Sequence, residues 1–286
     1  MKVPGVTTKR RWLIPEVVQS SAMDCGPAAL KSLLAGPNIP VSYGRLREAC
    51  QTDVDGTSID TLEEVARELG LEAEQILLPV DHVLLQEAHA LPAITVVRLP
   101  DGNTHFLVVW NHHAGVVQVM DPASGRRWLK RSRFLGGLYE HVMPVPAADW
   151  REWAFSEEAL ETLRRRMKEL GLDASTGEGL IQRARAPGWY PMACLDAAVR
   201  AVDSMVRCRG LRRGREAGRV LESLFNESLD REDDPTAIVP KAYWTVRSHE
   251  SNDGEEVVMV RGAVVVRVRQ KRSELEARTA TGEEIE

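Results

Sequence analysis

Apolar residues recur at helical spacing in the first quarter of the chain, and this pattern predicts three helices. Leucines line one face after Cys25 until Gly36 ends the run. A short second helix is predicted over residues 41–50. A third follows Thr57 and Ser58, either of which can cap it, and its apolar face consists of Ile59, Leu62, Val65, Ala66 and Leu69.

From residue 73 onward the apolar pattern alternates, which predicts β-strands. Residues with branched β-carbons are concentrated in four runs bounded by Pro, Gly, Asn and Asp, at 74–78, 93–98, 104–110 and 115–120. We expect these runs to form one antiparallel sheet. Between the first two, a short helix is predicted over residues 83–88, with His82 and His89 on a polar surface. The predicted fold class is therefore α+β, with N-terminal helices packed on an antiparallel sheet.

The second half of the chain returns to helical periodicity. Ser156 can cap an amphipathic helix that ends at Gly171, and its apolar face consists of Leu160, Leu163, Met167 and Leu170. The later predicted elements are helices over 179–184 and 192–206, strands over 242–248 and 256–269, and a Ser251–Gly254 turn between those strands. A charged tail from Lys271 to Glu286 is expected to be disordered. We thus expect two domains, residues 1–148 and a mainly helical region, residues 149–286.

Composition agrees with two domains and narrows the class of protein. The chain has 286 residues, of which 43% are hydrophobic and 28% are charged, enough for a sizeable core. Its net charge of -5 does not indicate a nucleic-acid partner. No apolar run reaches the length of a membrane span, and the start lacks the apolar core of a signal peptide. The expected location is the cytoplasm.

The cysteines and the arginines each suggest one further expectation. The four cysteines lack a paired Cys-x-x-Cys spacing, which argues against zinc and, in a reducing compartment, against disulfides. We expect no metal or cofactor. A basic run consists of Arg207, Arg209, Arg212, Arg213, Arg215 and Arg219. Such a run is most often a solvated face, and an acidic partner or a phosphate surface is the alternative.

Cys25 is the candidate nucleophile because it stands at a predicted helix start. Pro27 fits the first helical turn, and the free N–H groups of that turn stabilise a thiolate. These are the surroundings that lower the pKa of a cysteine. The alternative is a buried cysteine capped by Asp24. Gln19, six residues upstream, favours the first interpretation because its amide can donate to an oxyanion formed beside the sulfur.

His105 and Asp121 are brought together if residues 111–115 form a hairpin loop centred on His113. In that register the two side chains lie opposite each other, within reach of a hydrogen bond. A polar pair on a wet face is the alternative, and a bulge would shift the register by one and send Asp121 to the other face. His112 and His113 fall in the predicted turn and His141 on the surface, so we give them little weight as the base.

Taken together, these residues resemble a known family, and the matching motifs occur in one order: Gln19, Asp24-Cys25-Gly26, Tyr43-Gly44-Arg45-Leu46, Asp55-Gly56-Thr57-Ser58, His105-Phe106-Leu107-Val108-Val109 and Asp121-Pro122-Ala123-Ser124-Gly125. Residues 10–146 are similar to the bacteriocin-processing cysteine peptidases, a papain-like family. The resemblance implies that Cys25, His105 and Asp121 are catalytic and that Gln19 completes the oxyanion hole. It also implies a precursor peptide with a double-glycine leader as substrate and an ABC exporter as partner.

Two other functions stay open at this point. The chain can be a non-catalytic module that binds leader peptides, although such a module has no need of all four residues. It can also be a papain-like acyl transferase or isopeptidase acting on another amide. Residues 149–286 resemble no family that we recognise, and we expect them to dock the peptidase onto a partner. Truncation after residue 148 is then expected to leave a folded peptidase.

Overall fold

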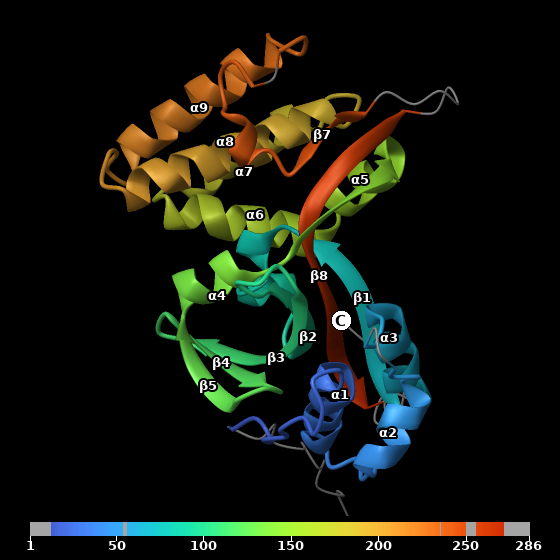
Figure 1. Cartoon of the computed structure of the whole chain (residues 1–286). Coiled ribbons are helices and arrows are strands. Elements are labelled where there is room, and N and C mark those ends of the chain that lie inside the picture. The colour runs from blue at the N-terminus through green and yellow to red at the C-terminus, as the bar shows by residue number, and fades with distance from the viewer. Residues whose placement is uncertain (1–12, 54–55, 235, 250–255, 272–286) are drawn as a thin grey trace, which may run out of the picture. The chain divides into compact units, whose positions relative to one another are not determined.

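The computed structural model describes residues 13–53, 56–234, 236–249 and 256–271 (Figure 1). The chain divides into two compact units: the first comprises residues 1–141 and 263–286, and the second residues 142–262. Within the described ranges, no helix is both long and apolar enough to cross a membrane.

The first unit begins with the three helices that the apolar spacing predicts. They are α1 (Cys25–Ala35), α2 (Tyr43–Ala49) and α3 (Ile59–Glu68). Serine hydroxyls cap two of them, because Ser42 accepts from Arg45 N at 3.3 Å and Ser58 accepts from Thr61 N at 3.1 Å. Both serines have extended backbone, as a capping residue requires.

An antiparallel sheet follows, and five of the six strands on its path were predicted, although β8 was assigned to the second domain. Its path is β1-β8-β2-β3-β4-β5. The bounds are β1 (Leu71–Leu78), β2 (Ala93–Arg98), β3 (Thr104–His113), β4 (Val116–Asp121), β5 (Gly125–Lys130) and β8 (Val257–Lys271). The α+β fold class is confirmed.

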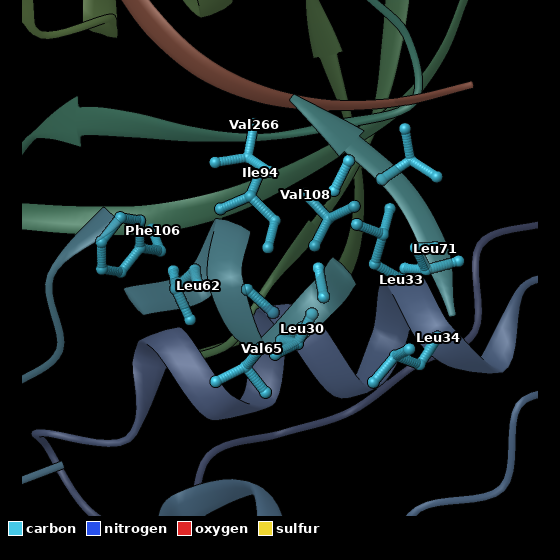
Figure 2. Close-up of a cluster of buried hydrophobic side chains, with 14 of the residues drawn as sticks. Leu30, Leu33, Leu34, Leu62, Val65, Leu71, Ile94, Phe106, Val108 and Val266 are labelled. Atoms are coloured by element: carbon cyan, nitrogen blue, oxygen red, sulfur yellow. The ribbon is translucent and has the colours of Figure 1, made fainter. Parts of the chain in front are cut away.

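Both faces of the central strands β2, β3 and β4 are buried, so most of their residues are apolar and the predicted alternation is weak there. On one face α1 and α3 pack against the sheet, and Figure 2 shows Leu30, Leu33 and Leu62 directed toward Ile94 and Val108. The other face is covered by α4 (Arg131–Gly137) and the chain between β1 and β2, with a core that includes Leu78, Val83, Val109, Val119, Phe134 and Val265.

Residues 83–88 do not form the predicted helix. The structure has two short 3-10 turns there, η1 (Val80–His82) and η2 (Gln86–Ala88). His82 is buried rather than on a polar surface, whereas His89 is exposed. The sequence analysis identified neither β5 nor α4, since both are short and β5 is polar on one side.

The second unit is mainly helical, as predicted. Its helices are α5 (Ala147–Ala154), α6 (Glu157–Glu169), α7 (Ala174–Ala184), α8 (Tyr190–Arg207), α9 (Arg215–Leu229) and the 3-10 turn η3 (Lys241–Tyr243). The Ser156 cap is present, with Ala159 N donating to its hydroxyl at 3.3 Å. Strand β7 (Val246–His249) pairs with β8, and β6 (Glu140–Pro146) also pairs with β8. The predicted turn at 251–254 and the tail lie outside the described residues.

The structure divides the chain differently from the boundary expected at residue 148. Strand β8 begins in the second unit but continues as residues 263–271 between β1 and β2 of the first. Two edge strands need a partner here, and the apolar residues of β8 supply it by pairing with both. The second unit is therefore inserted between residues 141 and 263 of the first unit and is not an appended domain.

Candidate active site

Cys25 is the first residue of α1, at the end of the helix where N–H groups lack helical partners. Asp24 precedes it but does not cap the helix through its side chain. Its fully buried carboxylate instead accepts from Ser20 Oγ at 2.9 Å and from Arg47 Nε at 2.8 Å. The helix start also packs closely on the loop before α3, because a Cβ on Gly26 would lie 3.0 Å from Thr57 Cβ.

The β3–β4 hairpin has a shorter turn than predicted. β3 continues to His113, so the turn is Ala114-Gly115, and both residues have positive φ, 48° and 81°. Two-residue turns of this kind match the twist of the strands. His112 and His113 therefore lie in the strand rather than in the loop, with His112 half-buried and His113 exposed.

A bulge in β3 decides whether Asp121 lies on the same face of the sheet as His105. Near the turn, Asn111 pairs with Gln118, and that register would place Asp121 opposite Val108. After the irregularity between 109 and 111, Val108 pairs with Met120, so Asp121 comes opposite Leu107. His105 lies two residues beyond Leu107 and thus on the same face as Asp121, as a diagonal neighbour. The predicted contact is present, but its predicted register was wrong.

His105 and Asp121 form the hydrogen-bonded pair at the centre of the site. His105 Nε2 lies 2.9 Å from Asp121 Oδ1, and both side chains are largely buried. The carboxylate also accepts from Ala123 N at 2.9 Å, from Ser124 Oγ at 2.7 Å and from Arg127 Nη1 at 3.2 Å. Roles for Ser124 and Arg127 were not predicted from the sequence. A polar residue that follows an aspartate at turn spacing is the signal that indicates a hydrogen bond to its carboxylate.

Cys25 and His105 are hydrogen-bonded through their side chains, and each shifts the pKa of the other. Burial raises the pKa of the Cys25 thiol, but the hydrogen bond from His105 and the N–H groups of Phe106 and Gly26 outweigh it, so the pKa is below its ordinary value. Burial lowers the pKa of His105, yet Asp121 and Cys25 raise it to about 9. Burial raises and His105 lowers the pKa of Asp121, which lies well below its usual range. Both shifts favour a thiolate beside an imidazolium, relative to the same side chains in water.

The backbone of Gln19 is hydrogen-bonded to the residue that follows Asp121. Its N–H donates to the carbonyl of Pro122 at 2.8 Å, which ties the segment before α1 to the turn after Asp121. Its side-chain Nε2 lies 3.4 Å from Ala22 O, a long contact, and its buried Oε1 has no hydrogen-bond partner among the described residues. The backbone of Gln19 is thus held in place, while the hydrogen-bonding capacity of its side-chain amide is only partly used.

The remaining candidates lie outside this site. Cys50 and Cys194 are buried, and burial raises the pKa of each to about 12. Cys208 and His141 are exposed. In the part of the chain that the structure describes, no group of three or more His, Cys, Asp or Glu side chains is placed to hold a metal ion.

We expect the Asp121→Asn substitution to change the pH dependence of the site more than its shape. The amide oxygen can still accept from His105 Nε2, but it carries no charge to stabilise the imidazolium. His105 is protonated in the native protein up to about pH 9 and loses its proton as the pH rises through that value. The alkaline limit of turnover, which requires protonated His105 to donate to the leaving amine, should therefore move to lower pH in the variant. Arg133→Ala, at an exposed residue of α4, should leave this limit unchanged.

The sequence of this chain is similar to those of known proteins. A profile of the peptidase C39 family matches residues 14–143, which include Cys25, His105 and Asp121. The lactococcin-G-processing and transport ATP-binding protein LagD of Lactococcus lactis is 27% identical over 110 residues, 38% of this chain. The chain spans only 16% of the length of LagD. An uncharacterized protein of Methanothermobacter thermautotrophicus is 31% identical over 119 residues, which cover 41% of this chain and 78% of that protein.

Two solved peptidase domains are also similar. One is a double glycine motif protease from an AMS/PCAT transporter in complex with the leader peptide, 24% identical, covering 46% of this chain and 89% of that one, with a TM-score of 0.39. The other is the peptidase domain of Streptococcus ComA, a bi-functional ABC transporter, 25% identical, covering 44% of this chain and 92% of that one, with a TM-score of 0.41.

Proposed function

Because this chain belongs to the peptidase C39 family, we propose that it is a cysteine endopeptidase that uses Cys25 as its nucleophile. The observation that supports this most directly is the placement of Cys25, His105 and Asp121 in one hydrogen-bonded series. A non-catalytic module that only binds peptides would gain nothing from a thiol whose pKa is held low.

In the proposed mechanism, the Cys25 thiolate attacks the carbonyl carbon of a peptide bond. His105 donates its proton to the leaving amine, and a thioester with Cys25 remains. His105, now neutral, takes a proton from water as the water attacks the thioester, and the acid product leaves. Asp121 holds His105 Nε2 throughout, which leaves Nδ1 directed at the sulfur and stabilises the imidazolium.

We propose that the tetrahedral oxyanion is bound by the backbone N–H of Cys25 and by the side-chain amide of Gln19. The N–H of a first helical residue has no helical partner, and the positive end of α1 favours the developing negative charge. The backbone of Gln19 is held by its hydrogen bond to Pro122, so only its side chain has to be ordered during the reaction.

Gln19→Ala should reduce kcat by about a hundredfold, because one oxyanion donor is lost. KM and the rate at which iodoacetamide labels Cys25 should change little, since neither depends on the oxyanion. Ser21→Ala, in the same exposed loop, is the matched control. An unchanged kcat in Gln19→Ala would remove Gln19 from the oxyanion hole.

For the substrate, we propose a precursor peptide with a double-glycine leader, and for the partner an ABC exporter. The support is the family and the relative that processes lactococcin G. Precursor peptides with Gly-Gly and with Gly-Ala before the predicted cut should lose the leader mass when incubated with the full chain. Cys25→Ala should abolish the loss. Unchanged mass with tight binding would identify a leader-binding module instead.

A further inference from the structure

The turn that joins α8 to α9 concentrates positive charge in the second unit. Figure 1 shows these two helices side by side and joined by a short turn at one end. Five arginines in and beside this turn are exposed: Arg209, Arg212, Arg213, Arg215 and Arg219. From the sequence alone, two roles stay open for the basic run between Arg207 and Arg219: a solvated face or a surface for an anionic partner.

The tertiary structure adds a lysine to these arginines. Gly214 N donates to Leu170 O at the end of α6, at 2.8 Å. Gly171 and Gly214 meet so closely that a Cβ on Gly171 would lie 2.6 Å from Gly214 N, and both have positive φ. This contact holds the turn against the end of α6, where Lys168 is exposed. We call Lys168 and the five arginines the basic end.

Among the described residues, the basic end lacks the ion pairs that several other arginines of this unit form. Arg164, Arg165 and Arg183 each lie 3.1 Å from a glutamate oxygen, and Arg207 lies 2.8 Å from Asp203. Among the residues that the structure describes, no side chain of the basic end forms such a pair. Six like charges gathered without partners repel one another, which an external anion would relieve.

Most of the charge at the ends of α9 runs against the helix macrodipole. Arg215 and Arg219 lie in its first turns, where negative charge is favoured and Glu216 supplies it, and Asp230, Glu232 and Asp233 follow its last turn, where positive charge is favoured. The macrodipole of α9 therefore does not explain why the two arginines lie at its start.

Exposed apolar side chains among the arginines indicate whether the anionic partner is a membrane surface or a nucleic acid. Met205 is 37% exposed, Cys208 is exposed and Leu211 is half-buried. Apolar residues interleaved with arginine are typical of segments that lie at a membrane interface. A surface for single-stranded nucleic acid would offer aromatic side chains for stacking, and residues 200–224 contain none.

We propose that the basic end binds the anionic phospholipid headgroups of a membrane surface. The arginines contact phosphate groups, and Met205 with Leu211 enters the boundary between headgroups and acyl chains. The inference is independent of the proposed peptidase activity, which a soluble peptide substrate measures without vesicles.

Flotation of the full chain with phosphatidylcholine vesicles, with and without phosphatidylglycerol, tests the proposal. Binding should require phosphatidylglycerol and should weaken as salt concentration rises. The triple variant Arg212→Glu, Arg213→Glu, Arg215→Glu should reduce partitioning by at least about a hundredfold, because each basic residue contributes roughly fivefold. The matched control changes the same charge at exposed residues elsewhere: Arg133→Glu, Arg231→Glu and Lys241→Glu. It should keep most of the binding.

Several results would overturn the proposal. One is equal binding to vesicles with and without phosphatidylglycerol. Another is an equal loss of binding in both triple variants. A third is no binding of the folded native chain to phosphatidylglycerol vesicles at low salt. Binding of polyglutamate or DNA without binding of anionic vesicles would identify a different partner and would overturn it as well. Melting temperatures of both variants near that of the native chain establish that the loss is one of binding.

Discussion

His105→Ala should reduce turnover roughly a thousandfold or more and should also make Cys25 slow to alkylate at neutral pH. Two effects combine in this variant. The acid that donates a proton to the leaving amine is lost, and so is the largest of the contributions that offset burial at the thiol. Because burial by itself raises the pKa of Cys25, the thiol should stay protonated near pH 7.

The measurement is the rate of iodoacetamide labelling at Cys25 against pH, with mass spectrometry to assign the site. In the native chain, labelling of Cys25 near neutral pH should exceed labelling of the buried Cys50 and Cys194. In His105→Ala it should require a distinctly higher pH. His113→Ala, at an exposed position of the same strand, is the control and should behave like the native chain. Native-like labelling in His105→Ala would contradict the thiolate–imidazolium pair.

Truncation after residue 148 should prevent the first unit from folding, although the sequence alone predicts that a peptidase remains. The truncation removes β8, which pairs with both β1 and β2. It also removes apolar side chains from the cores on both faces of the sheet: Ala263, Val265, Val266 and Val268. Each buried valine contributes about 1.5–3 kcal/mol. Their sum approaches the whole stability of a typical domain, about 5–15 kcal/mol.

Circular dichroism and urea unfolding of the purified fragments measure this effect. Truncation after Lys271 keeps all of β8 and should give a cooperative unfolding transition. The fragment that ends at 148 should be insoluble or should lack such a transition, and a synthetic peptide of residues 257–271 should restore part of it. A soluble, cooperatively folded fragment 1–148 would show that β8 is dispensable.

The helices of the first unit and the nucleophile were accessible from sequence because their signals are local. Apolar spacing, a serine cap and a terminating glycine are all contained within a few turns of chain, and α3 begins and ends where they predict. Cys25 could be placed at a helix start for the same reason. Local signals were weaker for β5, α4 and the two 3-10 turns, since short segments have no measurable period.

The contact between His105 and Asp121 was predicted from hairpin symmetry, but the register that produces it depends on tertiary packing. The turn is shorter than the polar residues 111–115 indicate, which shifts the pairing of β3 with β4. The bulge near Trp110 shifts this pairing back by one residue. Trp110 is buried beside α1, and a Cβ on Gly36 would meet its ring at 2.4 Å, so packing against the helix accompanies this irregularity. Such packing is a long-range effect that no window of sequence contains.

The sequence by itself determined the α+β class, the helix that presents Cys25, and the residue types that the site brings together. Only the tertiary structure decided that β8 completes the sheet and that Ser124, Arg127 and Arg47 hold the carboxylates around the site. Helix formation and capping depend on neighbours within a few residues, so a sequence pattern encodes them. Strand pairing across 193 residues, as between Glu74 and Arg267, depends instead on which edges remain unpaired once the rest of the chain has folded.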